Sequence, residues 1–147
     1  MRLTANQIAS LTPHAGNMCL LKGVLEWDQN RILCVGRDHR DPGNPLRVGE
    51  RFPATSAIEY AAQAMAVHGG LTGRIAARPR AGYLVSLRDV NCRHLFLDDL
   101  EGDIVVEAER LHEESGRVLY RFAVRAGSAE SVTGRAMVIL DADARPD

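Results

Sequence analysis

Stretches of partly alternating apolar and polar residues, each long enough for a β-strand, lie on both sides of a central alanine-rich segment. Alternation with a period of two is typical of a strand that buries one of its faces. Short segments rich in Asp, Glu, Asn, Gly and Ser separate several of these stretches and are typical of turns. The pattern predicts six strands, at residues 17–27, 31–38, 82–90, 103–112, 117–126 and 131–140.

Residues 55–68 follow a different pattern. Alanine occupies positions 57, 61, 62, 64 and 66, which gives the segment a high helix propensity, and Gly69-Gly70 supplies a stop signal. Apolar side chains occur nearly all round the predicted helix, as is typical of a buried helix rather than a surface one. The sequence therefore predicts a central helix that is covered by the sheet.

Two loops flank this helix. Residues 39–54 contain three of the six prolines and favour an ordered loop, whereas residues 72–82 are basic. We see no internal repeat, linker or low-complexity segment, so residues 1–147 are interpreted as a single domain. Two strands, one buried helix and four further antiparallel strands predict an α+β fold with a curved sheet around the helix.

Composition and charge narrow the class of protein. A chain of 147 residues with 46% hydrophobic residues is long enough for one well-filled core. The net charge of -1 gives no sign of nucleic-acid binding. Of the 18 basic residues only Lys22 is a lysine, so nearly all positive charge is on guanidinium groups, which suit phosphate and carboxylate partners.

The cysteines and the first residues indicate which features we do not expect in this protein. Cys19, Cys34 and Cys92 are an odd number with no CxxC pair, so we expect neither a disulfide framework nor a metal site. The first residues do not have the pattern of a signal peptide. No stretch approaches the roughly 20 apolar residues needed to span a bilayer, so we expect a cytoplasmic protein without membrane contact.

Three segments carry a resemblance to a known family. "LTPHAGNMCLL", "FPATSAIEYAAQAM" and "GYLVSLRDVNCRHLFLDDLEGDIVVEAE" resemble the N-terminal Pro-His segment, the central helix and the following strands of hotdog-fold 3-hydroxyacyl-(acyl carrier protein) dehydratases. The resemblance covers roughly residues 11–140. It implies a hotdog fold and matches Glu59 and Gln63 to the polar positions of the family's central helix.

One position departs from the family pattern. The dehydratases have a Gly-His-Phe-Pro-Gly motif whose His pairs with the helix Glu, and that His position corresponds here to Pro45. The nearest upstream histidine is His39. An altered loop with a retained Glu is more similar to the divergent dehydratases of aryl-polyene-type lipid pathways.

The resemblance implies the dehydration of a 3-hydroxyacyl thioester to a trans-2-enoyl thioester, in fatty-acid-like or polyene lipid biosynthesis. This reaction needs a base near Cα and an acid near the β-hydroxyl. A carboxyl group enclosed by apolar side chains can hold its proton near neutral pH, and Glu59 fits this acid role. His39 is the candidate for the imidazole.

Both residues have structural alternatives. Ser56 and Glu59 form an S-x-x-E capping box, in which Glu59 would reach back to the N-cap amide. His39 is alternatively a loop residue that bonds the backbone of its own proline-rich turn. The histidines at 14, 68, 94 and 112 are interpreted as packing or surface residues, with His68 on the helix face opposite Glu59.

Further residues are candidates for substrate binding. Amides from Ala54 onwards, at the start of the helix, can polarise the thioester carbonyl. Gln63, one turn after Glu59, either orients its carboxyl group or is a satisfied polar side chain at a subunit contact. Arg74, Arg78 and Arg80 either form a patch for an acidic carrier protein and its phosphopantetheine phosphate or form a solvated loop, with Arg40 and Arg47 as alternatives.

The predicted substrate is carried on phosphopantetheine, by acyl carrier protein or by coenzyme A, and no other cofactor is expected. A hotdog acyl thioesterase and a non-catalytic or half-site subunit are the alternative functions. We expect a homodimer or a higher hotdog oligomer, because an open sheet edge needs a cover, and a related hotdog subunit is the alternative partner.

Overall fold

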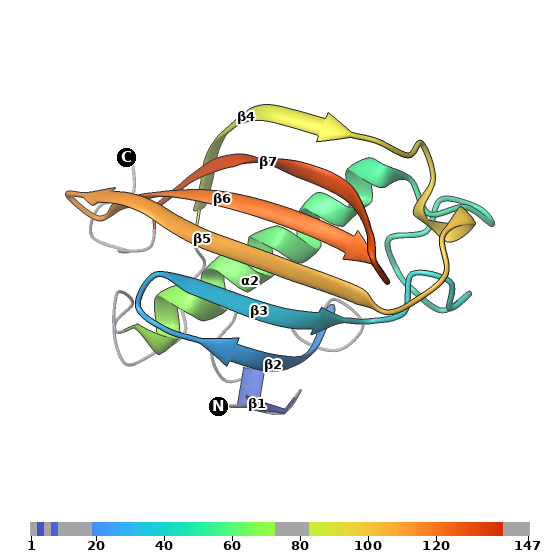
Figure 1. Ribbon diagram of the computed structural model, residues 1–147, viewed down its shortest axis with the longest axis horizontal. Coiled ribbons are helices and arrows are strands. Elements are labelled where there is room, and N and C mark those ends of the chain that lie inside the picture. Colours follow the sequence, from blue (N-terminus) through green and yellow to red (C-terminus); the bar gives the residue numbers. More distant parts are fainter. Residues whose placement is uncertain (1–2, 5–6, 9–18, 73–82, 140–147) are drawn as a thin grey trace.

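The computed structural model describes residues 3–4, 7–8, 19–72 and 83–139, and for 83–85 it describes the backbone alone. They form one antiparallel sheet with a single long helix against it (Figure 1). The strands are β1 (Leu3–Thr4), β2 (Leu21–Trp27), β3 (Arg31–Gly36), β4 (Tyr83–Cys92), β5 (Ile104–Glu114), β6 (Arg117–Ala126) and β7 (Ala129–Ile139). The helices are α2 (Ala57–Leu71) and two 3-10 turns, η2 (Ala54–Ser56) and η3 (Leu97–Asp99).

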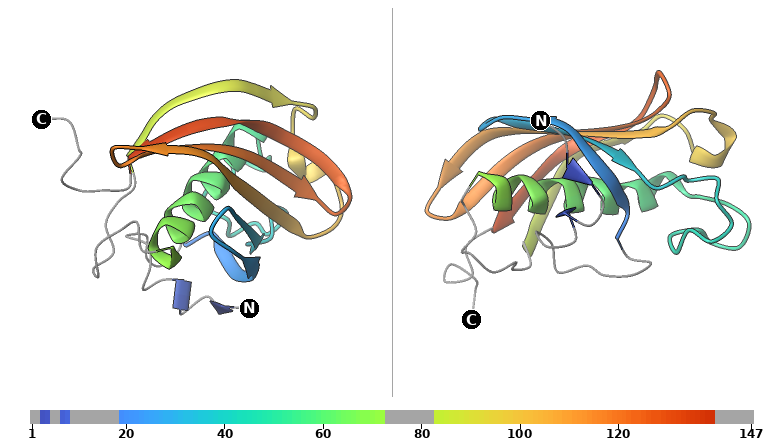
Figure 2. Two further views of the ribbon diagram at one scale, coloured as in Figure 1. Left: turned by 60° about the vertical axis from the view of Figure 1, so that its left-hand side comes forward. Right: turned by 90° about the horizontal axis from the view of Figure 1, so that it is seen from below.

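The strand order β1-β2-β3-β5-β6-β7-β4 places the chain's N-terminal strands at one side of the sheet and β4 at the opposite edge. The sheet curves strongly, and α2 lies in its concave face (Figure 2). Alternate residues of β6, from Val118 to Ala126, are buried because every second side chain points toward the helix. The predicted α+β fold, with a curved sheet around one central helix, is confirmed.

Each of the six strands predicted from alternation is present, with ends that differ by a few residues. The short β1 and the 3-10 turn η3 were missed. The turn at residues 28–30 was anticipated: the Asp28 carboxylate accepts hydrogen bonds from the amides of Asn30 and Arg31, at 2.7 and 2.9 Å. These two bonds also hold the pKa of Asp28 below its usual value.

The predicted end of the helix was wrong. Gly69 and Gly70 are both helical, and α2 continues to Leu71. The Thr72 hydroxyl and amide both donate to the His68 carbonyl, at 2.8 and 2.9 Å, so Thr72 supplies the cap that the glycines were expected to supply. Gly69 is buried, and burial against the sheet compensates for its low helix propensity.

In the described part of the chain, no helix has both the length and the apolar character that crossing a membrane requires.

Candidate functional site

One face of α2 is left uncovered by the sheet. Thr55 is exposed and Ile58, Glu59 and Ala62 are half-buried, whereas nearly all other residues of the helix are buried. Spacings of three and four residues place these four side chains on one side of the helix, here called the open stripe. Glu59 is its only charged member. Glu59 is half-buried because the sheet alone does not cover this face, and its enclosure by apolar side chains stays a prediction.

The start of the helix is fixed by a carboxylate from a distant segment. Asp98 accepts a hydrogen bond from the Phe52 amide and another from Arg51 Nε, each at 2.8 Å. Burial alone would raise the pKa of Asp98, but these two bonds hold it below its usual value. The Arg51 guanidinium also lies 3.9 Å from the ring centroid of Phe96. These contacts hold the backbone before the helix against the segment that leads into η3.

A cavity of about 390 Å³ lies beside this fixed start. Its lining includes Ala54 and Thr55 from η2, and Cys92, His94, Leu95 and Phe96 from the end of β4 and the residues after it. Because Thr55 belongs to the open stripe, the cavity opens one helical turn from Glu59.

The inner side of β4 continues the apolar surface. Leu87 pairs in register with the buried Ala136, so both point to the concave side of the sheet, yet Leu87 is 39% exposed. Val90, which packs above Gly134, is 38% exposed. Among the described residues, the open stripe and these apolar β4 side chains thus form a surface on the concave side that the sheet does not cover.

His39 is not on the open stripe. Its ring is fully buried and meets the Phe52 ring edge-on, at 6.3 Å between centroids. Nε2 lies 2.8 Å from the Leu100 carbonyl, and because a carbonyl only accepts, this nitrogen carries the proton. Nδ1 has no hydrogen-bond partner and lies 3.6 Å from an Asp38 carboxylate oxygen. The partner of His39 is thus the segment before β5, and the proposed bond to its own turn was wrong.

The cap predicted for Ser56 was also wrong. Ser56 has helical dihedral angles, makes no cap bond, and its hydroxyl donates to the Leu46 carbonyl at 3.1 Å. The Ala54 amide donates to the Leu95 carbonyl at 3.0 Å, so it is not a free donor for a substrate carbonyl. Both groups were expected to serve the helix end or a ligand, and both instead bind loops that the fold brings to the helix.

Gln63 is buried and ties the helix to β2. Its Oε1 accepts a hydrogen bond of 2.9 Å from the Leu20 amide, immediately before β2. Buried backbone amides need such partners, so Gln63 has a structural role in addition to its position one turn from Glu59.

The candidate arginines divide into two groups. Arg74, Arg78 and Arg80 lie outside the described residues. Arg47 donates to the carbonyls of His39 and Glu50, and the Arg40 guanidinium lies 3.9 Å from a Glu101 carboxylate oxygen. Arg47 therefore has structural partners in the loop before the helix.

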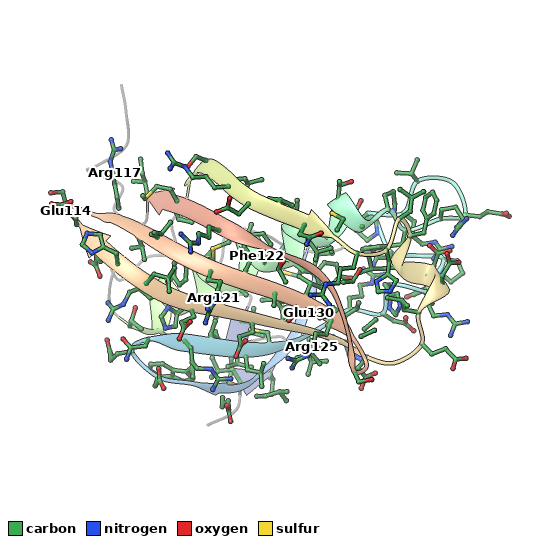
Figure 3. All side chains as sticks on the ribbon, turned by 45° about the horizontal axis from the view of Figure 1, so that its top comes forward. Glu114, Arg117, Arg121, Phe122, Arg125 and Glu130 are labelled. Carbon is green, nitrogen blue, oxygen red and sulfur yellow. The ribbon has the colours of Figure 1, made fainter. Side chains whose placement is uncertain are left out.

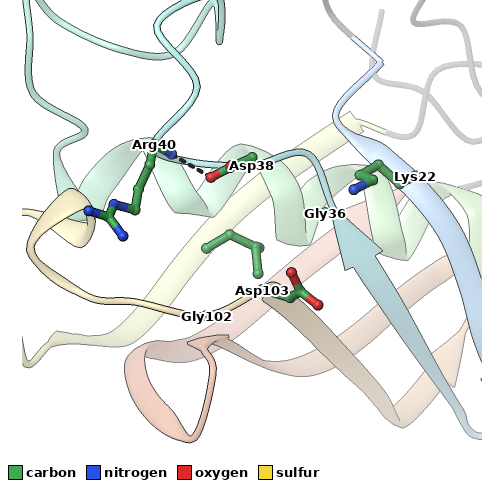
Figure 4. Close-up of a pocket in the computed structure, with 7 residues that line it drawn as sticks. Lys22, Gly36, Asp38, Arg40, Gly102 and Asp103 are labelled. Carbon is green, nitrogen blue, oxygen red and sulfur yellow. Dashed lines mark hydrogen bonds between the residues drawn. The ribbon is translucent and has the colours of Figure 1, made fainter.

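A second hollow, of about 220 Å³, lies where β3 ends and β5 begins (Figure 4). Its lining carries two cationic side chains, Lys22 and Arg40, and two carboxylates, Asp38 and Asp103. Opposite charges in equal number and few apolar atoms do not suit an acyl chain. Within the described residues, no group of three or more His, Cys, Asp or Glu side chains could hold a metal ion.

Sequence reasoning missed two residues of this region. His94 was interpreted as a packing or surface residue, but it lines the cavity, with Nδ1 3.3 Å from the Ser131 hydroxyl. Asp98 begins the segment "DDLEG", one of the short acidic and Gly-containing segments between predicted strands that were interpreted only as turns. The acidic pair Asp98-Asp99 after an aromatic residue was the available signal, but its partner Arg51 lies 47 residues earlier.

Tyr60 supports the loop that holds His39, and it gives a pH-dependent prediction. Its hydroxyl donates to the Arg37 carbonyl at 2.6 Å and accepts from Asn44 at 2.8 Å. Burial raises the pKa of Tyr60 to about 12. Because the folded pKa lies above the unfolded value of about 10, the stabilisation is complete below pH 10 and is lost as pH rises toward 12.

We expect Tyr60→Phe to lower the free energy of unfolding near pH 7 by about 1–2 kcal/mol, because two hydrogen bonds are lost. Its stability should fall less steeply than that of the natural chain above about pH 10. Urea unfolding at a series of pH values measures both effects. If the free energy of unfolding fell equally steeply above about pH 10 in both proteins, Tyr60 would not be the group responsible for the alkaline loss of stability.

The fold and the site define the class: a single helix wrapped by an antiparallel sheet makes this a hotdog-fold protein. Solved structures agree. A chain of the dehydratase heterocomplex ApeI:P from Xenorhabdus doucetiae is similar with a TM-score of 0.79, 23% identity and 90% of each chain covered. A mutant thioesterase from Pseudomonas aeruginosa gives a TM-score of 0.63 at 10% identity, with 92% of each chain covered. The Escherichia coli PaaI protein gives 0.56 at 10% identity, with 79% of this chain and 80% of that chain covered.

The sequence profile of the ApeP-like family, described as ApeP dehydratase, matches residues 6–145. The chain belongs to this family of dehydratases. The assignment agrees with the dehydration of a 3-hydroxyacyl thioester and with the divergent aryl-polyene-type branch that the sequence predicts. No curated protein matches the chain at the level of sequence.

Proposed function

We propose that this chain supplies the acid half of a dehydratase site, with Glu59 as the proton donor and a related hotdog subunit as the source of the imidazole. In the proposed step, the imidazole removes the Cα proton of a 3-hydroxyacyl thioester and the Cα=Cβ bond forms. The Cβ–O bond breaks as the Glu59 carboxyl donates its proton, and the hydroxyl leaves as water.

The single observation that carries this proposal is the position of Glu59. It is the only charged side chain on the open stripe of a helix that is otherwise almost entirely buried, one turn from an apolar cavity. A carboxyl group beside an apolar cavity is a suitable general acid for an acyl substrate that the cavity holds. A second subunit laid over the stripe would enclose Glu59 and exclude water from the reaction.

We propose a second subunit because the His39 ring is buried in the core and does not reach the open stripe. Its ring is 0% exposed and its Nε2 already donates to Leu100. The solved structure with a TM-score of 0.79 belongs to a dehydratase made of two different chains, which supports a heteromeric site. A homodimer remains the simpler arrangement, and in a homodimer His94 would be the imidazole that lines the cavity.

We further propose that the acyl group is delivered on the phosphopantetheine arm of an acyl carrier protein. The cavity lining by Ala54, Leu95 and Phe96 suits an acyl chain or the apolar part of the arm. The proposed contacts for the carrier and its phosphate are Arg74, Arg78 and Arg80, because guanidinium groups form bidentate hydrogen bonds with phosphate.

The experiment compares the chain alone with the chain co-purified with a hotdog subunit from its host. Each is given a 3-hydroxyacyl thioester on acyl carrier protein, and the absorbance of the conjugated enoyl thioester is followed beside the release of free thiol. We expect enoyl formation by the complex only, and no loss of that activity in His39→Gln, whose amide can still donate to Leu100. Thiol release without enoyl formation would indicate a thioesterase.

His94→Gln is the matched control. If the chain alone formed the enoyl product and His94→Gln abolished it, the imidazole would come from a copy of this chain, and the two-subunit proposal would be wrong. If His39→Gln abolished activity while its folding was unchanged, the buried imidazole would have to be part of the site.

A further inference from the structure

The edge of the sheet at β4 is open. β4 pairs with β7 on one side, and within the described residues no strand pairs with its other side, so β4 is an edge strand of the described sheet. A ten-residue edge strand with exposed Leu87 and Val90 is a template for a strand from another chain. A β-bulge at Asp89, which has a φ of 55°, bends the strand but does not cover its edge.

The outer, convex side of this edge carries two arginines directly opposite each other. Arg88 of β4 pairs in register with Arg135 of β7, and like charges in this position destabilise a sheet. Arg121 of β6 is the next residue along the same row and lies on the outer face (Figure 3), where its guanidinium pairs with Glu109. The two arginines nearest the open edge are less well compensated.

Arg88 and Arg135 have few carboxylates near enough to form an ion pair. Arg135 lies 4.0 Å from a carboxylate oxygen of Asp89, which is 75% exposed. For Arg88, the described part of the chain places no carboxylate oxygen within 4.0 Å. Both line a hollow of about 170 Å³ with Ser86 at its wall and with the apolar side chains of Leu119 and Met137. Two guanidinium groups and a hydroxyl around a small hollow fit a carboxylate side chain.

A second copy of this chain would not supply that carboxylate well. Antiparallel pairing of β4 with the same strand of a copy continues one sheet, so both Arg88-Arg135 pairs would lie on the same outer face. Strands are about 4.8 Å apart, so in a register that sets Arg88 beside the same residue of the copy the four guanidiniums lie within roughly 10–15 Å of one another. At an ionic strength of about 0.1 M the Debye length is about 10 Å, so their repulsion is only partly screened.

We propose that the β4 edge is built for a subunit of opposite charge, one whose own edge strand presents Asp or Glu on its outer side to Arg88 and Arg135. The inference rests on the proposed pairing with a related hotdog subunit and adds the charge of the surface that this subunit must carry. Apolar contacts on the concave side would join the two subunits, and the arginine pair would select against self-pairing.

The test measures self-association of the purified full chain by sedimentation equilibrium, at roughly 0.05 M and about 1 M salt. We expect weak self-association at low salt that strengthens at high salt. Arg88→Glu should tighten self-association at low salt by roughly tenfold or more and remove its salt dependence. Lys22→Glu is the matched control, because it changes the net charge equally on β2, near the opposite edge, and it should behave as the natural chain.

Tight self-association at low salt that salt and Arg88→Glu leave unchanged would overturn the proposal. So would an equal effect of Arg88→Glu and Lys22→Glu, which would show that only net charge matters. With the co-purified subunit, Arg88→Glu should weaken the complex, and an unchanged complex would likewise overturn it. These measurements need no substrate, so a failed dehydration assay and a failed association test are distinguishable.

Discussion

Glu59→Gln is expected to reduce enoyl formation by roughly 100-fold or more while leaving the free energy of unfolding nearly unchanged. The amide keeps the size and much of the hydrogen-bonding capacity of the carboxyl group, but it cannot deliver a proton to the leaving hydroxyl. Because Glu59 is half-buried on the open stripe and outside the core, its replacement leaves the packing of the helix intact. The measurement is the rate of enoyl formation per folded molecule, beside a urea unfolding curve.

Ala62→Ser serves as a control on the same face. It adds a small polar group one turn beyond Ile58 on the open stripe without touching the carboxyl, so we expect a modest change in activity and no comparable loss. A Glu59→Gln protein that unfolds more easily but keeps its turnover would show that the carboxyl has a structural function alone.

Phe52→Ala is expected to lower the free energy of unfolding by about 3–5 kcal/mol, the largest stability effect we predict. The Phe52 ring is 0% exposed and lies between the rings of His39 and Tyr60, at 6.3 and 6.0 Å between centroids. Its removal leaves a cavity beneath the loop and the start of the helix. Thermal and urea unfolding measure the loss.

Leu95→Ala provides the matched control, since Leu95 is 78% exposed at the wall of the neighbouring cavity. A change within about 0.5 kcal/mol is expected there. If both variants lost similar amounts of stability, Phe52 would not be the side chain that anchors the start of the helix.

The parts of the site that sequence could predict are those that depend on local pattern. The alanines and the apolar residues nearly all round residues 55–68 indicated a buried helix, and the four-residue spacing put Glu59 and Gln63 on neighbouring turns. The family motif carried the dehydratase prediction, which the match over residues 6–145 confirms. The role of Glu59 stays a prediction.

The wrong predictions for the two helix ends and for His39 have a common cause. Gly69-Gly70 was expected to end the helix, Ser56 to cap it, and His39 to bond its own turn. In the fold, Ser56 bonds a residue 10 positions earlier and His39 bonds one 61 positions later. A local sequence pattern does not predict hydrogen-bond partners that are 10 or 61 positions away. Any polar group with suitable geometry can satisfy the same donor or acceptor.

By itself, the sequence determined the six longer strands, the long helix, their order and the one acidic residue on that helix, because periodicity and propensity act over a few residues. Only the tertiary structure decided that the sheet leaves one face of α2 open, that His39 is sealed away from it, and that Arg88 and Arg135 meet at a free edge. These features depend on which distant segments pack together, and packing is fixed by the burial of the whole chain at once.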